Sequence, residues 1–184
     1  LPAIASMTIV AILWSFLINN DYGIYLYWFR KIGINIPNLL NSTTWAMPTM
    51  IVIGIWKNLG FKMIILIAGL ESISETYYEA ARIDGGTPFN NLKYITIPML
   101  MPTLTFVTVD SVISSFQVFD QVYVITKGGP LFSTETLVQY VYSNAFEKSN
   151  MGYASALATM LLVITLIASV PLFRVMKRNE NELR

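Results

Sequence analysis

Long apolar runs separated by short polar connections make up most of the sequence. The hydrocarbon core of a bilayer is about 30 Å thick, and a helix needs about 20 apolar residues to cross it. The pattern therefore predicts an all-α membrane protein, with spans over residues 2–18, 44–70, 95–119 and 153–176. The first of these runs is the shortest and lies at the lower limit for a span.

The segments around these spans also carry structural signals. Residues 44–70 exceed the length of one crossing, so they form either one long helix that projects from the membrane, which we favour, or a shorter span followed by a second helix. Pro98 and Pro102 are expected in the first turns of the third span, where a missing N–H donor costs least. Residues 19–44 are rich in Tyr and Trp, which is typical of an interfacial segment, and residues 135–149 predict a short amphipathic helix.

Composition supports the bilayer as the solvent. Of the residues, 54% are hydrophobic and 12% are charged, about half the charged fraction of a soluble domain. The net charge of +1 gives no reason to expect nucleic acid as a partner. The chain contains neither Cys nor His, which excludes disulfides, thiolate or imidazole metal sites and His-based catalysis. We expect no metal and no cofactor bound by this chain.

The chain begins without an initiator Met and without a basic region before its first apolar run, which is not the form of a signal peptide. We expect it to begin inside a longer protein. Four spans would place both chain ends on one side of the membrane. Six basic residues favour the cytoplasm for that side, against four in the other connections. The six are Arg82, Lys93, Arg174, Lys177, Arg178 and Arg184, and the four are Arg30, Lys31, Lys127 and Lys148.

Residues 72–94 form a polar connection between the second and third spans. Ser72-Ile73-Ser74-Glu75 fits a capping box, so a helix should follow through Arg82. Gly85-Gly86 should end this helix, because glycine adopts left-handed conformations without a Cβ clash. Thr87 and Pro88 should begin the next one, as N-cap and first residue. The connection is predicted to be a helix, a sharp turn and a second helix.

The same connection resembles the EAA signature of ABC importer permeases. Glu79-Ala80-Ala81 is followed after three residues by Gly85, and after nine more by Ile95, Ile97 and Pro98, with Ile97 where the family has Leu. Further positions resemble the carbohydrate-importer branch, and among these Gly128-Gly129-Pro130 is typical of the first permease subunit of sugar and glycerol-3-phosphate importers, related to the maltose-importer permease. The other matching positions are Ala68-Gly69-Leu70, Ile73, Tyr78, Ile83-Asp84-Gly85, Phe116, Phe119, Thr126, Ser133-Thr134, Tyr140, Tyr142, Ala145-Phe146 and Gly152-Tyr153-Ala154.

The resemblance implies a fold and a set of partners. The fold is the transmembrane helix bundle of type I (MetI-like) importer permeases without its N-terminal helices, and residues 1–184 would form one domain, a four-span core with 72–94 as its coupling loop. The protein would be a non-catalytic multi-pass subunit of the bacterial cytoplasmic membrane. It would pair with a second permease subunit as a heterodimer, receive a sugar or oligosaccharide from an extracytoplasmic solute-binding protein, and leave ATP to a cytoplasmic ABC ATPase dimer. The residues that would contact the ATPase are Tyr78, Glu79, Ala80, Ala81, Arg82, Asp84 and Gly85.

The third span carries the candidate residues of a substrate path. Thr103, Asp110, Ser114, Gln117 and Gln121 share one face of a continuous helix, and polar groups within a membrane should point into the protein. They either hydrogen-bond a sugar, with Phe116 or Phe119 stacked on its ring, or hydrogen-bond neighbouring helices; we favour packing for Ser114 and, from the resemblance, path-lining for Gln117. Asp110 is a functional candidate by its position within the span, although the family offers no counterpart.

Other functions stay open. A permease for a different solute, such as glycerol-3-phosphate, a polyamine or an inorganic anion, is the first alternative. An intramembrane enzyme using Asp110 with Glu79 lacks a base and nucleophile at the same depth of the membrane. A membrane scaffold without transport is the last, and co-purification of the chain with an ATPase would exclude both of these.

Overall fold

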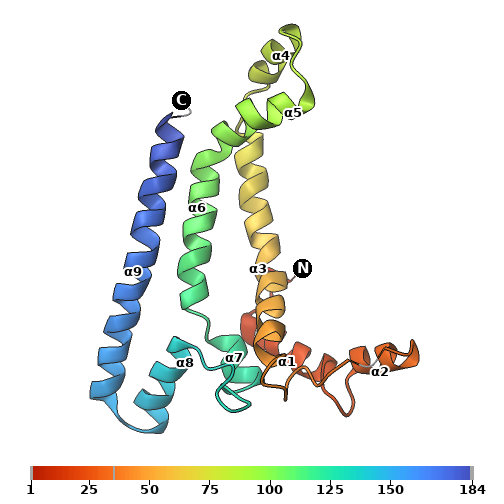
Figure 1. Ribbon diagram of the computed structural model, residues 1–184, viewed down its shortest axis with the longest axis vertical. Coiled ribbons are helices and arrows are strands. Elements are labelled where there is room, and N and C mark those ends of the chain that lie inside the picture. The colour runs from red at the N-terminus through yellow and green to blue at the C-terminus, as the bar shows by residue number, and fades with distance from the viewer. Residues whose placement is uncertain (1, 35, 183–184) are drawn as a thin grey trace. The chain divides into compact units, whose positions relative to one another are not determined.

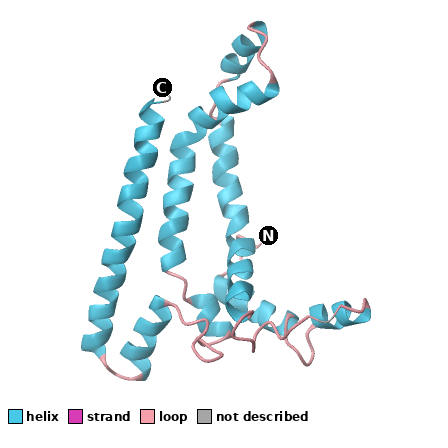
Figure 2. Cartoon of the chain, viewed as in Figure 1, coloured by secondary structure: helices cyan, strands magenta, loops and turns pink. Residues whose placement is uncertain are grey.

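The computed structural model describes residues 2–34 and 36–182. All regular structure in these residues is helical (Figure 2), which confirms the predicted all-α fold. The elements (Figure 1) are α1 (Met7–Leu17), α2 (Ile24–Lys31), α3 (Ala46–Glu71), α4 (Glu75–Ile83), α5 (Pro88–Asn91), η1 (Leu92–Thr96), α6 (Ile97–Phe116), α7 (Asp120–Ile125), α8 (Leu137–Tyr142), η2 (Ser143–Glu147) and α9 (Met151–Glu182).

Three stretches of helix in the described residues are long and apolar enough to cross a membrane: Ala46–Glu71, Pro88–Ile125 and Met151–Arg178. The first of them is the single helix α3, so residues 44–70 form one long helix, as we favoured. In each stretch only 11% of the most hydrophobic 18-residue window is buried. Most of their apolar side chains are therefore exposed at the surface of the chain, as suits contact with lipid.

The first predicted span has a different structure. Residues 2–18 form only α1, which has 11 residues and is about 16 Å long, too short to cross the hydrocarbon core. Its start is fixed late in the segment by Ser6, whose hydroxyl accepts a hydrogen bond from the Ile9 N–H at 3.3 Å. The apolar side chains of α1 serve the core of the protein instead, where Val10 and Ala11 are buried.

This difference changes the predicted topology. Both chain ends were expected on one side because four spans were predicted, and three do not support that arrangement. If each of the three span-length helices of the described residues crosses the membrane once, residues 72–94 and the end of α9 lie on one side, and the segments before α3 and between α6 and α9 lie on the other. The same six basic residues fall on the side of the polar connection and the same four on the opposite side. The polar connection is therefore still predicted to face the cytoplasm.

The third span begins earlier and ends sooner than predicted. Helix runs from Pro88 through η1 into α6, which ends at Phe116. The η1 segment is a π-helical turn in which the Ile97 N–H donates to the Leu92 carbonyl. Pro98 and Pro102 are the second and sixth residues of α6 and so lie in its first turns, as predicted, although helix continues into α6 from η1. A wide π turn relieves the crowding that a proline ring imposes on the preceding carbonyls.

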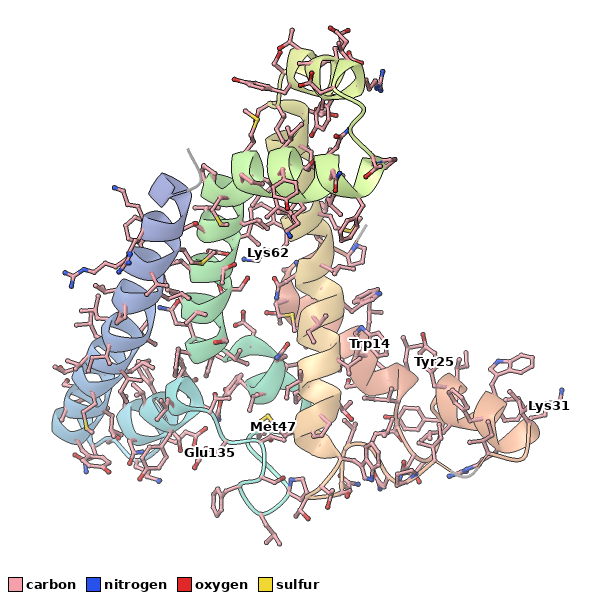
Figure 3. The ribbon with its side chains drawn as sticks, turned by 45° about the horizontal axis from the view of Figure 1, so that its top comes forward. Trp14, Tyr25, Lys31, Met47, Lys62 and Glu135 are labelled. Atoms are coloured by element: carbon pink, nitrogen blue, oxygen red, sulfur yellow. The ribbon has the colours of Figure 1, made fainter. Side chains whose placement is uncertain are left out.

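The described residues form two compact units, and each is considered by itself. Residues 1–60 and 116–162 make the first, residues 61–115 and 163–184 the second. The apolar core of the first unit consists of Val10, Ile18, Met50, Ile53 and Val122. Beside it the Trp14 ring stacks on Tyr25 at 5.6 Å and meets the edge of Trp56 at 5.4 Å (Figure 3 labels Trp14 and Tyr25).

The loop that carries Gly128-Gly129-Pro130 also belongs to the first unit, and threonines hold it. The Thr134 side chain is fully buried, and its hydroxyl donates to the Gly129 carbonyl at 2.8 Å. The hydroxyls of Thr134 and Thr126 lie 2.7 Å apart and hydrogen-bond each other. Gly128 has φ +86°, a left-handed conformation that suits glycine. The Gly-Gly-Pro residues and the neighbouring threonines therefore act together as one fixed loop.

In the second unit, α3 and α6 pack as antiparallel neighbours. At Gly69 an added Cβ would lie 2.6 Å from Thr103 Oγ1 and 2.9 Å from Leu100 Cδ1, so the two helices approach closely there. The other contact is the ion pair of Lys62 with Asp110. Lys62 precedes Gly69 by seven residues on α3, and Asp110 follows Thr103 by seven residues on α6. Seven residues are about two helical turns, which brings both contacts onto the same face of each helix.

We predict that Gly69→Ala destabilises the protein and that Gly152→Ala does not. The methyl group added at position 69 would overlap Thr103, and such overpacking costs about 1–3 kcal/mol. Gly152 is also helical, but an added Cβ there meets nothing within 4 Å. Thermal unfolding of the purified protein in detergent measures both effects. Equal melting temperatures for the two variants would contradict the close approach at Gly69.

Candidate functional site

The polar connection contains α4 between two structured turns. The predicted capping box is wrong, because the Ser72 hydroxyl accepts no hydrogen bond from the first turn of α4. It donates instead to the Gly69 carbonyl in the last turn of α3, at 2.7 Å. Ser74 is the N-cap residue by position, but its hydroxyl bonds the Thr76 hydroxyl at 2.8 Å and no backbone N–H. Helix α4 nevertheless begins at Glu75, as the position of this carboxylate in its first turn favours.

The turn after α4 has the predicted chemistry. Gly85 has φ +77°, and the Gly86 N–H donates to the Ala81 carbonyl at 2.7 Å, which closes the C-terminus of the helix. A Cβ on Gly86 would lie 2.8 Å from that same oxygen, so glycine is needed there as well. Thr87 caps α5 by accepting from the Asn90 N–H at 3.3 Å, and Pro88 is the first helical residue. These contacts confirm the helix, turn and helix.

Most of the predicted coupling residues are open to solvent. Glu79, Ala80, Arg82, Asp84 and Gly85 are exposed, whereas Tyr78 and Ala81 are half-buried. Two apolar side chains that were not among the predicted coupling residues are exposed with them: Ile83 at 87% and Phe89 at 71%. Large exposed apolar side chains in a polar connection are typical of a surface that contacts another protein or the membrane.

Tyr78 connects α4 to the start of the third span. Its hydroxyl hydrogen-bonds Thr96 Oγ1 at 2.9 Å, and that oxygen also donates to the Asn91 carbonyl at 3.3 Å. Thr96 ends η1, directly before α6. Helix α4 is therefore linked to the start of α6 by a hydrogen bond as well as by the chain itself. Thr96 lies 18 residues from Tyr78, and no sequence signal pointed to it.

The second site is an ion pair within the spans. Lys62 Nζ on α3 contacts the Asp110 carboxylate on α6, and Figure 3 shows Lys62 extending from α3. The side chains are 18% and 41% exposed, respectively. A charge within the hydrocarbon region is costly unless it is paired, so each residue provides the counter-ion that the other needs. Our sequence analysis selected Asp110 but missed its partner, although an isolated lysine within an apolar run was the available signal.

Asp110 also borders a hollow of about 380 Å³ in the second unit. Its lining is mainly apolar and includes Phe106 and Phe173, with Lys177 as a further charged residue. Asp110 therefore has the Lys62 ammonium group on one side and open space on the other. This position is compatible with its predicted place on a substrate path, which stays a prediction.

The predicted path residues do not all share one helical face, because α6 ends before Gln117 and Gln121. Ser114 is exposed on α6, and Phe116 is its last residue. Gln117 is exposed beyond the end of the helix. The predicted continuous face therefore ends at Ser114, and the periodicity on which it depended does not extend to Gln117 or Gln121.

Phe119 and Gln121 belong to the first unit and have partners within it. Phe119 stacks on Tyr123 with ring centroids 5.1 Å apart, and the tilted ring of Tyr142 also lies 5.1 Å away, so one face of the Phe119 ring is covered within this chain. Tyr123 hydrogen-bonds the Tyr142 hydroxyl, and this bond raises the pKa of Tyr142. Gln121 is buried, and its amide lies within 3.2 Å of where a Gly54 Cβ would be. Gln121 therefore packs against α3.

A family model with the description "Binding-protein-dependent transport system inner membrane component" matches residues 1–183. The chain belongs to this family. The three span-length helices of the described residues agree with a location in the membrane. Within the described residues, no group of three or more His, Cys, Asp or Glu side chains is placed to hold a metal ion.

Two relatives and a solved structure are similar over most of the chain. It is 34% identical over 178 residues to the sn-glycerol-3-phosphate transport system permease protein UgpA of Brucella abortus, covering 96% of the chain and 59% of the relative. It is 27% identical over 180 residues to the sulfoquinovosyl glycerol transport system permease protein SmoG of Agrobacterium fabrum, covering 98% of the chain and 58% of the relative. The chain thus spans less than two thirds of their length.

The solved structure is a bacterial ABC transporter involved in the import of the acidic polysaccharide alginate. It matches with a TM-score of 0.85 and 24% identity, covering 96% of this chain and 62% of that one. The match shows a shared fold, that of an ABC importer permease, which agrees with the fold that the motif spacing implied.

We predict that Tyr78→Phe loosens α4. The variant loses the bond to Thr96, worth about 1 kcal/mol, which corresponds to about a fivefold change in the population of open conformations. Trypsin should then cleave after Arg82 about five times faster, and Thr96→Val should have the same effect. Tyr77→Phe is the matched control, because Tyr77 is 51% exposed on the same helix. Unchanged cleavage of both test variants would contradict the link.

We predict that Lys62→Met and Asp110→Leu are each more harmful than the two together. Either change leaves one charge unpaired within the membrane, at a cost of about 2.5–3.5 kcal/mol, whereas the double variant has no charge to compensate. Thermal unfolding of the three variants in nanodiscs provides the double-mutant cycle. If the losses of stability in the two single variants add up to the loss in the double variant, the ion pair does not contribute to stability.

Proposed function

We propose that the chain is the transmembrane permease subunit of a binding-protein-dependent ABC importer that carries a sugar or oligosaccharide. It is a transport subunit without catalytic chemistry of its own, it binds no cofactor, and ATP is hydrolysed by a partner. The observation that carries this proposal is the α4–turn–α5 connection, which presents Glu79 and Gly85 in the spacing of the EAA signature beside exposed Ile83 and Phe89.

The proposed partner of this connection is a cytoplasmic ABC ATPase dimer. A cleft on an ATPase subunit would receive α4, covering the apolar side chains that are now in water. Closure of the ATPase dimer by ATP would then displace α4. The Gly85–Gly86 turn and the Tyr78–Thr96 hydrogen bond would carry the displacement into α6. The spans would change between inward-open and outward-open states by this movement.

Two further partners complete the proposed complex. A second permease subunit would cover part of the apolar surface of the spans, since only 11% of each span's most hydrophobic window is buried in this chain. An extracytoplasmic solute-binding protein would deliver the solute, as the family description implies.

A sugar is the solute that the sequence favours, through the Gly128-Gly129-Pro130 loop and its threonines. SmoG is named for transport of sulfoquinovosyl glycerol, which contains a sugar. The alternative is a non-sugar solute such as glycerol-3-phosphate, a polyamine or an anion, and it is supported by the similarity to UgpA, which is named for sn-glycerol-3-phosphate. ATP hydrolysis by the complete transporter, stimulated by members of a solute panel with the binding protein present, decides between them.

We predict that Glu79→Lys and Gly85→Asp abolish transport without preventing membrane insertion. The first reverses a charge on the exposed face of α4, and the second puts a side chain at φ +77°, where only glycine is unstrained. Uptake by proteoliposomes and ATPase co-purification measure the effects. Glu71→Lys is the matched control, because this exposed glutamate ends α3 outside the motif. Normal uptake by both variants would exclude the assigned coupling role.

A further inference from the structure

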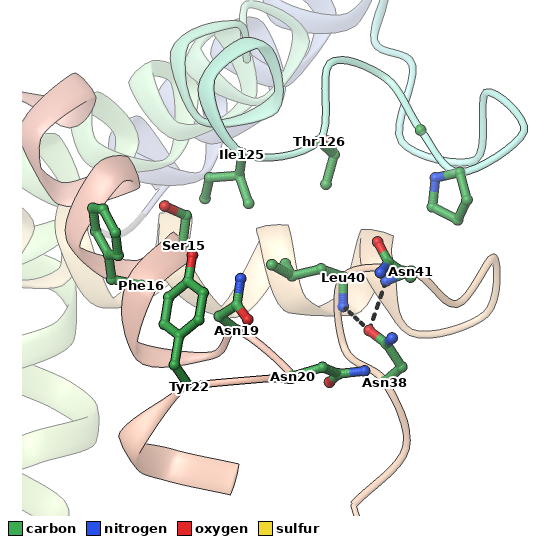
Figure 4. Close-up of a pocket in the computed structure, with 12 residues that line it drawn as sticks. Ser15, Phe16, Asn19, Asn20, Tyr22, Asn38, Leu40, Asn41, Ile125 and Thr126 are labelled. Carbon is green, nitrogen blue, oxygen red and sulfur yellow. Dashed lines mark hydrogen bonds between the residues drawn. The ribbon is translucent and has the colours of Figure 1, made fainter.

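The first unit contains a pocket that the coupling mechanism does not use (Figure 4). Its volume is about 480 Å³, within the range of about 300–1,000 Å³ typical of small-molecule sites. Three segments line it, namely the end of α1 with the turn after it, residues 38–41 before α3, and the loop that begins at the end of α7. Four of the lining residues carry side-chain amides: Asn19, Asn20, Asn38 and Asn41.

Local hydrogen bonds orient two of these amides. The Asn38 side-chain oxygen accepts from the backbone N–H groups of Leu40 at 3.2 Å and Asn41 at 2.9 Å, shown as dashed lines in Figure 4. The Asn19 oxygen accepts in the same way from the Asp21 N–H at 2.9 Å. Both oxygens are therefore engaged, and each amide keeps its NH₂ group as a donor. Within the described residues, neither these NH₂ groups nor the side chains of Asn20 and Asn41 form a hydrogen bond.

Two aromatic rings stand at the same pocket. Phe16 and Tyr22 both line it, with ring centroids 6.2 Å apart and planes at 44°. They are 57% and 65% exposed, so their faces are open to a ligand. Amide donors and acceptors next to exposed aromatic faces suit a molecule that has hydroxyl groups on its edge and C–H groups on its face.

The lack of charged side chains in the lining also bears on which class of ligand the pocket fits. No Lys, Arg, Asp or Glu is among the described residues that line the pocket. Phosphate and carboxylate groups are normally held by arginine, lysine or a row of backbone N–H groups. The pocket therefore fits a neutral polyhydroxylated molecule better than an anion such as a sugar phosphate.

The order of the spans relates the side of the membrane that the pocket faces to the side of the polar connection. All its lining segments lie in residues 1–45 or 117–150, which three crossings put on the side opposite the basic polar connection. If that connection faces the cytoplasm, the pocket faces the exterior.

We propose that this pocket is an extracytoplasmic binding site for a neutral saccharide. The asparagine amides hydrogen-bond its hydroxyl groups, and Tyr22 or Phe16 stacks on one face of its ring. The proposal rests on the proposed import of a sugar and narrows that sugar to an uncharged one. It also gives the Gly128-Gly129-Pro130 loop a role, since Gly129 and Pro130 close one side of the pocket.

Cysteine labelling tests the site directly, because the chain has no cysteine of its own. Asn20→Cys and Asn41→Cys are introduced separately into the complete transporter in nanodiscs, and their reaction with a membrane-impermeant maleimide is timed. Glucose, maltose, sucrose and raffinose are the neutral probes, glycerol-3-phosphate is the anionic one, and the binding protein is left out. We expect at least one neutral saccharide to slow labelling at both positions more than fivefold. Tyr27→Cys, on α2 outside the pocket, should react unchanged.

A matched pair of aromatic variants tests the stacking. Tyr22 and Tyr27 are 65% and 63% exposed, and each lies 6.2 Å from a neighbouring aromatic ring, but only Tyr22 lines the pocket. In the Asn20→Cys background, Tyr22→Ala should raise the saccharide concentration for half-protection at least fivefold, and Tyr27→Ala should not.

The other outcomes overturn the proposal in distinguishable ways. Protection by glycerol-3-phosphate alone would show an anion site. Protection by the binding protein without any saccharide effect would show that the pocket receives a segment of that protein. If no probe protects and the transporter still imports one of these sugars, the pocket proposal fails and the proposed function stands. Protection without uptake of any probe would support the pocket and count against sugar import.

Discussion

The pairing of α3 with α6 is the interaction on which the second unit depends. Two contacts define it, the close approach at Gly69 and the ion pair between Lys62 and Asp110, and they lie seven residues apart along each helix. The close approach at Gly69 is steric and sets the separation of the two helices. The ion pair is electrostatic and sets their register along the helix axes. A sliding movement of one helix by a single turn would separate the charges in a medium that solvates neither of them.

The polar connection extends directly from this helix pair. Helix α4 follows the end of α3 after three residues, and η1 leads into α6 without a break. Because Tyr78 also bonds Thr96, α4 is attached to the pair at both ends and at one point along its length. Such an attachment resists bending, and this is the property needed in a segment that is to transmit force between a soluble partner and the spans.

Much of this arrangement could be predicted from local signals. The Gly85 turn and the Thr87 cap depend on the backbone preferences of single residues, and the structure has both. The length of the first segment could not be predicted, because an apolar run such as 2–18 suits a core helix as well as a span. Neither could the Lys62–Asp110 pair, since it depends on which faces meet once Gly69 lets the helices approach. Gln117 and Gln121 were wrongly placed on the helical face of Ser114, because helical periodicity was extended past the end of α6.

The exposed side chains of the connection also have a consequence for solubility. Ile83 and Phe89, at 87% and 71% exposed, are large apolar groups on a polar segment, and such groups promote aggregation when nothing covers them. The partner proposed for the connection would cover them, so the same two side chains that suit a docking surface make the isolated subunit more prone to aggregate than the assembled one.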